Sequence, residues 1–289
     1  MLRILFTIPI PSIPGLLPGG ATIPVFSYGT FIALGFFVSY LYTCWLAKKR
    51  GIDEETITDI FLVIIISSIV GSRLNFVASQ WSHYVAHPAA IFKVWEGGMV
   101  YLGGFIGAIA GGLVYLRIRG LAAGPFLDMF APTVPFAQAL GRLGCLCNGC
   151  CYGVPTDLPW GMSFPIQGEW SRPRHPTQLY EVVILLALSI FLHFYYRRNR
   201  IPGLVMVGYG YLYGLERFAI EFFRAESMEE HYLFGTTLAQ TTCMALVLVT
   251  LTYHLAIVRH PATGGGLARE APGQARRRSG ASTDEKKHQ

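Results

Sequence analysis

One arginine inside an apolar stretch is the first residue whose setting points to chemistry. The stretch Asp128–Gly153 reads DMFAPTVPFAQALGRLGCLCNGCCYG, and Arg142 within it is bracketed by Gly141 and Gly144. A charged side chain at the centre of a bilayer costs about 2.5–3.5 kcal/mol on insertion scales. Arg142 is therefore a candidate functional residue. The alternative is an arginine that only pairs with a carboxylate between helices.

A second set of ionisable residues recurs at helical spacing later in the chain. Tyr213, Arg217, Glu221 and Arg224 would form one stripe along one face of a helix. Within a membrane such a stripe must face the bundle interior or a wet cavity. Arg217 and Glu221 could form an ion pair, but the arginines together predict that the stripe carries a net positive charge. A positive cavity suits an anionic headgroup, because the planar guanidinium binds phosphate.

A histidine and two polar residues open a further helix. His175 precedes Pro176, which fits the first helical position. Gln178 and Glu181 are three residues apart and share a helix face. His175 is either a capping or hydrogen-bonded surface group or a base that works near neutral pH.

Four of the six cysteines crowd into a short segment, as Cys145, Cys147, Cys150 and Cys151. Thiolates bind zinc or iron–sulfur clusters, but this spacing matches no standard site and no second Cys/His pair completes one. A disulfide, or small residues packed at a tight turn, are the other interpretations. We favour packing or a disulfide, so the sequence predicts no metal and no other cofactor.

The composition places these residues in a membrane. Of the 289 residues 52% are hydrophobic and 14% are charged, whereas a soluble domain has about 25% charged residues. We therefore predict an all-α fold, a polytopic membrane helix bundle rather than soluble domains. The net charge of +6 does not indicate nucleic-acid binding, because much of it falls in the C-terminal tail and in short loops.

Seven apolar stretches predict seven transmembrane helices, at about residues 28–47, 58–79, 98–116, 125–147, 177–196, 203–223 and 236–257. Pro132 and Pro135 should kink the fourth. Residues 1–26 are expected to be an irregular or interfacial arm, residues 27–258 the transmembrane domain, and residues 259–289 a disordered basic tail.

Basic residues predict the orientation, because they gather on the cytoplasmic side. With the first loop inside, that side holds the tail and Lys48, Lys49, Arg50, Arg117, Arg119, Arg197, Arg198 and Arg200. The N-terminus is then outside and the C-terminus inside. The intramembrane polar residues, among them Arg73, Arg142 and Arg217, would lie at one depth in the outer half of the bilayer.

In these residues the chain resembles bacterial prolipoprotein diacylglyceryl transferases. The matching pieces, in order, are Ser27-Tyr28-Gly29, Gly71-Ser72-Arg73-Leu74, Trp95-Glu96-Gly97-Gly98-Met99, Gly103-Gly104-x2-Gly107, Asp128-x2-Ala131-Pro132, Gly141-Arg142-x-Gly144, Asn148-Gly149, Gly153, Arg174-His175-Pro176-Thr177-Gln178-Leu179-Tyr180-Glu181 and Tyr213-Gly214-x2-Arg217-x3-Glu221-Phe222-Phe223-Arg224. The resemblance implies transfer of the diacylglyceryl group of phosphatidylglycerol to the lipobox cysteine thiol of preprolipoprotein signal peptides. It implies a multi-pass protein of the bacterial cytoplasmic (inner) membrane, whose partners are membrane lipid and these peptides and not nucleic acid.

The resemblance also implies a site. Catalytic roles fall to Arg142, Arg217, Glu221 and His175, and the two arginines would stabilise the phosphate leaving group. Substrate-binding roles fall to Arg142, Tyr28, Gly103, Gly104, Asn148, Gly153, Tyr213, Arg224 and Gln178. Arg73 is expected to be mainly structural.

The chain departs from the family pattern at three positions. Leu102 stands where the family usually has a histidine, and Cys145 and Cys150 replace an asparagine and a glutamate. One alternative is that His175, Glu221 or Tyr28 serves as the base, or that the thiol ionises without one. The other is a divergent relative: one with a different acceptor, a non-catalytic phospholipid-binding protein, or a membrane thiol redox or metal protein.

Overall fold

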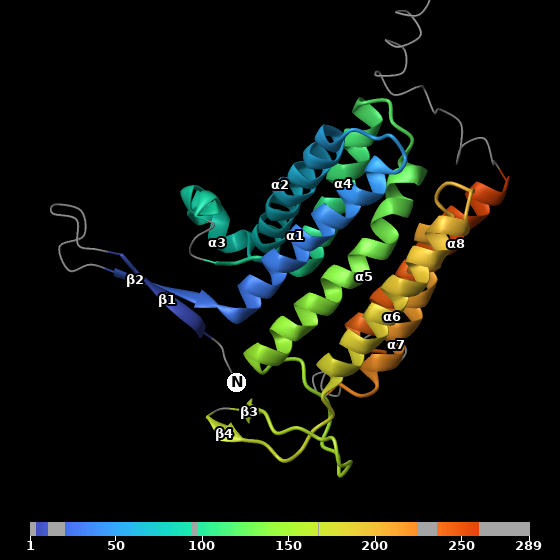
Figure 1. The fold of residues 1–289 in the computed structure, drawn as a ribbon. Helices are drawn as coiled ribbons and strands as arrows, with labels where there is room; N and C mark the ends of the chain where they lie inside the picture. Colours follow the sequence, from blue (N-terminus) through green and yellow to red (C-terminus); the bar gives the residue numbers. More distant parts are fainter. Residues whose placement is uncertain (1–3, 11–20, 94–96, 167, 225–235, 260–289) are drawn as a thin grey trace, which may run out of the picture. The chain divides into compact units, whose positions relative to one another are not determined.

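The computed structural model describes residues 4–10, 21–93, 97–166, 168–224 and 236–259. Its long helices are α1 (Ser27–Lys48), α2 (Glu54–Ser79), α4 (Tyr101–Ile118), α5 (Ala123–Asn148), α6 (Thr177–Arg198), α7 (Leu204–Glu221) and α8 (Leu238–Arg259) (Figure 1). Each begins and ends within about one turn of a helix that the sequence predicts. Two short helical segments, α3 (Trp81–Ala86) and η1 (Pro88–Phe92), lie in the loop after α2.

The N-terminal arm differs from its prediction. Strands β1 (Ile4–Ile10) and β2 (Ala21–Phe26) pair antiparallel, with Ile4 opposite Phe26. The prolines in this arm do not prevent pairing, because each strand of a two-stranded ribbon has one edge free of ladder bonds. A second ribbon, β3 (Pro165–Ile166) with β4 (Glu169–Trp170), lies in the loop between α5 and α6. The rest of the arm, Trp95 and Glu96, and the tail from residue 260 lie outside the described residues.

The helices form two compact units. The first combines residues up to Tyr42 with residues from Leu127 onward, so it holds most of α1 and the helices α5 to α8. The second begins at Thr43 and ends at Phe126, and it contains α2, α3, η1 and α4.

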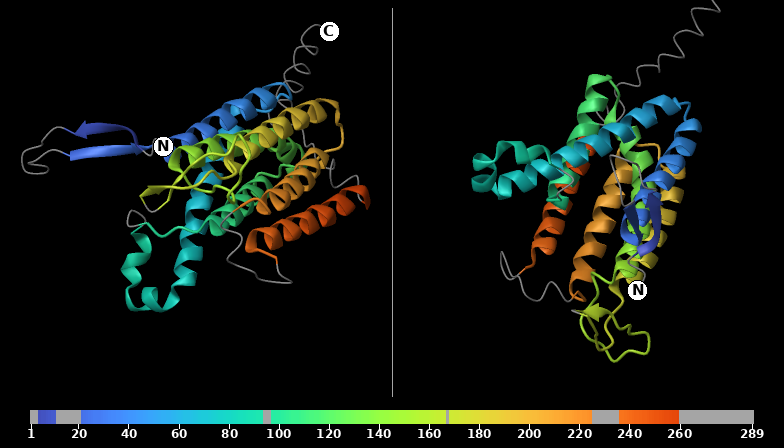
Figure 2. Two further views of the ribbon diagram at one scale, coloured as in Figure 1. Left: turned by 90° about the horizontal axis from the view of Figure 1, so that it is seen from below. Right: turned by 90° about the vertical axis from the view of Figure 1, so that its left-hand side faces the viewer.

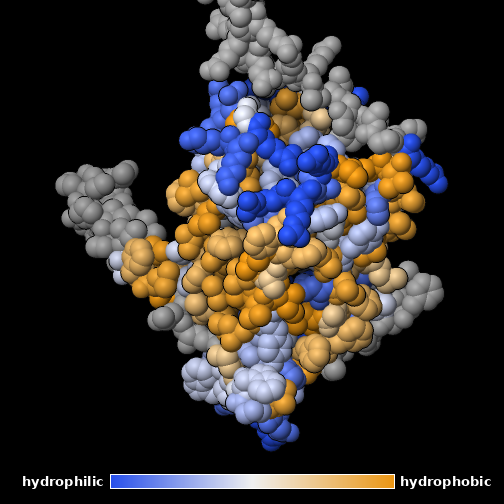
Figure 3. Space-filling view, turned by 45° about the vertical axis from the view of Figure 1, so that its right-hand side comes forward, coloured by the Kyte–Doolittle hydropathy of each residue, from blue (hydrophilic) through white to orange (hydrophobic). Residues whose placement is uncertain are grey.

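Four of the described helices, α1, α2, α6 and α8, are long and apolar enough to cross a membrane, and Leu102–Ile118 is a shorter apolar helix. Large apolar side chains on these helices face outward; on α6, Val183 is 68% exposed and Ile190 is 59% exposed. Figure 3 shows apolar side chains gathered over the middle of the face that it presents. These features are those of a multi-pass membrane protein.

In the second unit, glycines hold α2 against α4. A Cβ atom on Gly103 would overlap the carbonyl oxygen of Gly71, and one on Gly107 would overlap that of Ser67. A Cβ atom on Gly104 would make a tight contact, 3.1 Å from the hydroxyl oxygen of Ser68. Because the helix backbones touch, these small residues are required for packing. A substrate-binding role for Gly103 and Gly104 stays a prediction.

Arg73 is buried in the second unit and is structural, as the sequence predicts. Its guanidinium donates at 2.7–3.3 Å to the backbone carbonyls of Ala90, Ile91, Lys93, Gly97 and Gly98. These bonds use the donors of the side chain to hold η1, Lys93, Gly97 and Gly98 against α2.

In the first unit, α5 continues through Pro132 and Pro135. Two serines donate to carbonyls in this stretch: Ser39 of α1 to Thr133 at 3.1 Å, and Ser189 of α6 to Pro132 at 2.7 Å. Interhelical bonds of this kind stabilise helices that associate in a membrane. The predicted kink stays a prediction.

Asp128 near the start of α5 caps α7. Its carboxylate accepts hydrogen bonds from the backbone N–H groups of Gly203 (2.8 Å), Val205 (2.9 Å) and Met206 (3.0 Å). A carboxylate satisfies the free N–H groups of a helix start and also favours the positive end of the helix dipole. Helix α7 lies between α6 and α8, as Figure 2 shows.

Replacing this cap should weaken the first unit. We expect Asp128→Asn to lower the free energy of unfolding by about 1–3 kcal/mol, because a charged acceptor of buried N–H groups is lost. Thermal unfolding of the purified protein in detergent measures this. The exposed Asp157→Asn is the control, and equal stability of both variants would contradict a capping role for Asp128.

Candidate active site

A buried ion pair joins α5 to α6. Nη2 of Arg142 lies 2.7 Å from Oε1 of Glu181, and their side chains are 19% and 2% exposed. The other carboxylate oxygen of Glu181, Oε2, is buried and has no hydrogen-bond partner among the described residues. Arg142 is therefore oriented by Glu181, while one carboxylate oxygen of Glu181 can still accept a hydrogen bond.

A second ion pair lies on α7. Nη1 of Arg217 lies 2.5 Å from Oε2 of Glu221, and Oε1 of Glu221 accepts a hydrogen bond from Thr237 Oγ1 at 3.2 Å. Glu221 thus orients the guanidinium of Arg217, as the sequence predicts. Tyr213, one turn earlier, stacks on Tyr209 with ring centroids 5.3 Å apart.

The polar stripe of α7 is shorter than predicted. The helix ends at Glu221, and buried Arg224 lies beyond it, where its backbone bridges to Gly153. A Cβ atom on Gly153 would lie 2.5 Å from the carbonyl oxygen of Phe223 and 2.6 Å from Cβ of His175. Gly153 is therefore needed for close chain packing, and the bridge ties the end of α7 to the loop after α5.

The first turn of α6 is hydrogen-bonded to the cysteine-rich turn after α5, which contains Cys150 and Cys151. Thr177 Oγ1 donates to the carbonyl of Cys151 at 2.7 Å, and Nε2 of Gln178 donates to that of Cys150 at 2.6 Å. The other amide atom of Gln178, Oε1, is buried without a partner among the described residues. Nδ1 of His175 lies 3.1 Å from the hydroxyl oxygen of Tyr180, so the histidine is hydrogen-bonded to the start of α6.

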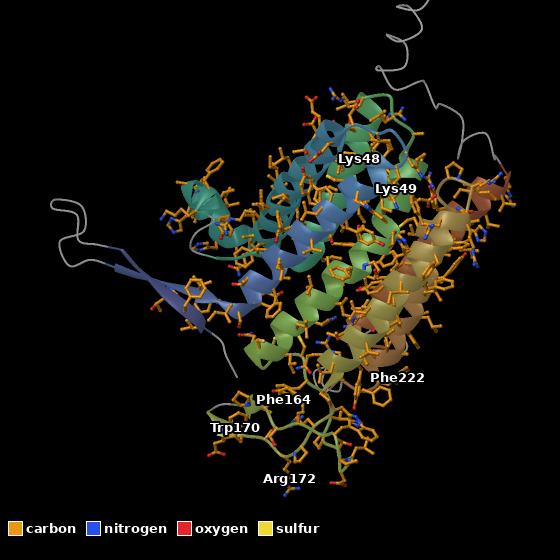
Figure 4. All side chains as sticks on the ribbon, in the orientation of Figure 1. Lys48, Lys49, Phe164, Trp170, Arg172 and Phe222 are labelled. Atoms are coloured by element: carbon orange, nitrogen blue, oxygen red, sulfur yellow. The ribbon has the colours of Figure 1, made fainter. Side chains whose placement is uncertain are left out.

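Figure 4 shows Phe164, Trp170 and Arg172 on the loop between α5 and α6, and Phe222 near the end of α7.

Three thiols meet beside Arg142. The Sγ atoms of Cys145, Cys150 and Cys151 all lie within 4.8 Å of one another. Asn148 Nδ2 is 3.5 Å from the Cys150 sulfur. Tyr28 of α1 interacts electrostatically with all three thiols and with Arg142, and Gly144 leaves room for its approach, since a Cβ there would lie 3.3 Å from the Tyr28 Cα.

The charge of the site differs from its prediction. Glu216 of α7 is 8% exposed, and neither of its carboxylate oxygens has a hydrogen-bond partner among the described residues. It interacts electrostatically with Glu181, Arg142 and Arg217. The described cluster therefore sets Arg142, Arg217 and Arg224 against Glu181, Glu216 and Glu221. The positive charge that the sequence predicts counts the arginines and Glu221 but leaves out Glu181 and Glu216.

An apolar groove of about 670 Å³ runs between α6 and α7. Its walls include Ile184 and Leu188 of α6 and Leu212, Leu215 and Ala219 of α7, and Glu216 lines it as well. The buried carboxylate thus lies where the polar cluster meets an apolar surface. A groove with these walls suits hydrocarbon chains.

The structure brings together most residues that the sequence selected. The catalytic candidates Arg142, Arg217 and Glu221 share this cluster with Tyr28, Tyr213, Arg224 and Gln178. The sequence missed Glu181 as the partner of Arg142, and it missed Glu216 altogether. Glu181 lies three residues after Gln178 and Glu216 directly precedes Arg217, but spacing alone does not pair helices.

Comparison with known proteins gives one consistent match. The family model for prolipoprotein diacylglyceryl transferase matches residues 17–256. A phosphatidylglycerol–prolipoprotein diacylglyceryl transferase of Geobacter sulfurreducens is 36% identical over 237 residues, which cover 80% of this chain and 90% of the relative. Its counterpart from Methylococcus capsulatus is 34% identical over 237 residues, covering 76% and 86%. One from Cupriavidus pinatubonensis is 40% identical over 181 residues, covering 61% and 64%.

The ion pair between α5 and α6 should be energetically coupled. Arg142→Met leaves the Glu181 carboxylate buried without its cation, and we expect a loss of about 3–5 kcal/mol in unfolding free energy. Adding Glu181→Gln should restore most of that loss, because the uncompensated charge disappears. Unfolding in detergent measures both variants beside the exposed control Arg198→Met. A double variant no more stable than Arg142→Met would show that the two residues are not coupled.

Proposed function

The chain belongs to the prolipoprotein diacylglyceryl transferase family and is a diacylglyceryl transferase, and we propose that Arg142 and Arg217 bind the phosphate of its lipid substrate. The reaction transfers the diacylglyceryl group of phosphatidylglycerol to a prolipoprotein. The acceptor atom is the thiol of a lipobox cysteine, a thioether forms, and glycerol phosphate leaves.

The observation that carries the phosphate proposal is the pair of anchored arginines on two helices. Each guanidinium has five N–H donors, and its carboxylate partner uses few of them. The remaining donors can bind phosphate oxygens from two directions, with both cations already oriented by Glu181 and Glu221. Fixed cations stabilise the negative charge that develops on a departing phosphate.

Buried acceptors beside the arginines suit the rest of the headgroup. Oε1 of Gln178 and Oε2 of Glu181 have no donor among the described residues. Leaving a buried acceptor unsatisfied costs about 1–3 kcal/mol, so a ligand hydroxyl that donates there is bound favourably. The glycerol headgroup of phosphatidylglycerol carries two such hydroxyls.

The acyl chains would lie in the apolar groove between α6 and α7. That groove opens beside Glu216, which interacts electrostatically with both arginines. Hydrocarbon chains in the groove would place the glyceryl carbon next to the polar cluster without passing through water.

Lysine cannot replace either arginine in this arrangement, because it keeps the charge but loses the planar fork. We expect Arg142→Lys and Arg217→Lys to fold and to transfer labelled diacylglycerol to a lipobox peptide about 10²–10³-fold more slowly. The assay uses purified variants at matched amounts of folded protein.

The control for this assay is Arg73→Lys in the second unit, which should lose stability and keep its turnover per folded molecule. Near-normal transfer by both Arg142→Lys and Arg217→Lys would contradict the proposal that these two arginines bind the substrate phosphate.

We further propose seven membrane-spanning helices in the bacterial inner membrane, with the N-terminus outside. Helices α5 and α7, which carry Arg142 and Arg217, would be membrane spans as well. Basic residues at the ends of α1, α4, α6 and α8 support a cytoplasmic location for those ends.

Reporter fusions test this orientation. A fusion in the loop at Asp157 should report the outside and one in the tail at Ser279 the inside, because the excess of basic residues lies on the cytoplasmic side. A fusion after Arg50 is the cytoplasmic control. The same side for both test sites would exclude the arrangement of seven spans.

A further inference from the structure

The three-thiol cluster has the donors of a metal site. Thiolates bind zinc at about 2.3 Å, which sets neighbouring sulfurs about 3.8 Å apart in a tetrahedron. In the structure the sulfurs of Cys145, Cys150 and Cys151 lie within 4.8 Å of one another. Each would move by less than about 1 Å to reach that geometry, which is a small rotation of the side chain.

Both neighbouring elements of the first unit hold these cysteines in place. Cys145 lies in the last turns of α5 and is 8% exposed. The backbone carbonyls of Cys150 and Cys151 are hydrogen-bonded to Gln178 and Thr177 of α6. Helix α5 and these bonds therefore hold the backbone from which all three thiols extend.

Cys151 adds an independent observation. Among the described residues it is the one non-glycine with a positive φ, at 62°. That conformation costs a residue with a Cβ atom about 1–2 kcal/mol, and such strain concentrates at functional sites. With this backbone conformation, the Cys151 sulfur lies within 4.8 Å of those of Cys145 and Cys150.

We propose that Cys145, Cys150 and Cys151 bind a zinc ion, and that its open fourth position takes the acceptor thiol of the transfer reaction. Catalytic zinc sites have three protein ligands and one open position, as this cluster would. A disulfide would join two of the sulfurs and leave the third beside it unused. Three thiolates and one Zn²⁺ carry one net negative charge, and Arg142 interacts electrostatically with Cys145 and Cys151.

The role in the reaction rests on the proposed transferase function. A free cysteine thiol is mostly protonated at neutral pH, and a thiol that coordinates a metal is deprotonated. The sulfur of the acceptor then attacks the glyceryl carbon and a C–S bond forms. The C–O bond to phosphate breaks, and glycerol phosphate leaves with the bonding electron pair. The thiol proton ends on that phosphate, so atoms and charge balance.

Metal content is the first test. The full chain is purified in detergent from zinc-supplemented cells without chelator, and zinc and reactive thiols are counted after denaturation. We expect about one zinc per chain in the wild type and in Cys147→Ser, whose sulfur is outside the cluster. Cys145→Ser, Cys150→Ser and Cys151→Ser should each lose most of the metal. Cobalt in place of zinc should give a thiolate charge-transfer absorption in the wild type and in Cys147→Ser.

Two outcomes of the first test overturn the proposal. One is a zinc-free protein whose six cysteines all react, which indicates packing. The other is a zinc-free protein with fewer reactive thiols, which indicates a disulfide.

The effect of the metal on the transfer rate is the second test. A thiol with a pKa near 8.5 is about 3% thiolate at pH 7, so removing zinc should slow transfer about 30-fold there. The deficit should shrink above pH 8.5, and added zinc should restore the rate. Full activity of the zinc-free protein at pH 7 would overturn the inference and leave the transferase function intact. Bound zinc in a protein that transfers no lipid would leave the metal site standing and contradict both the transferase function and the role in thiol activation.

Discussion

A charge in a low-dielectric interior must have a partner, and the first unit is arranged around that constraint. Arg142 meets Glu181 across α5 and α6, and Arg217 meets Glu221 along α7. A buried pair of this kind gives little net stability, but breaking it is costly. Helices α5 and α6 therefore cannot shift against each other without separating Arg142 from Glu181. Each guanidinium is oriented by its own carboxylate, across two helices for Arg142 and within one helix for Arg217.

The cations of the site are partnered, whereas several of its acceptors are not. Glu216, Glu181 and Gln178 keep buried oxygens without donors among the described residues. A folded protein retains few such groups, because each is destabilising. Their concentration beside two anchored arginines is the observation that favours a binding site over a set of structural salt bridges. The glycines of α2 and α4, by contrast, are required for close packing of those helices.

Hydropathy and spacing predicted the helices well, because a long apolar run has few other ways to fold in a bilayer. They also selected Arg142, Arg217 and Glu221. What they could not supply was contact between helices: nothing in the spacing pairs Arg142 with Glu181. Spacing could not place the cysteine thiols relative to one another either. Cys145 lies on a helix and Cys150 and Cys151 lie beyond its end, so their distances depend on how the turn folds back. The pairing of β1 with β2 was missed because the Pro- and Gly-rich arm was interpreted as irregular or interfacial.

The cap on α7 also fixes where the two arginines lie along their helices. Arg142 lies 14 residues after Asp128, and Arg217 lies 14 residues after Gly203, whose N–H group the Asp128 carboxylate binds. The two helices meet at that shared point and run the same way from it, so each arginine lies about 21 Å further along its helix. Inserting one residue in either interval would move its arginine by about 1.5 Å and turn it by about 100°. The length of these two segments is thus constrained independently of their composition, and natural length variation in this chain should be confined to its loops.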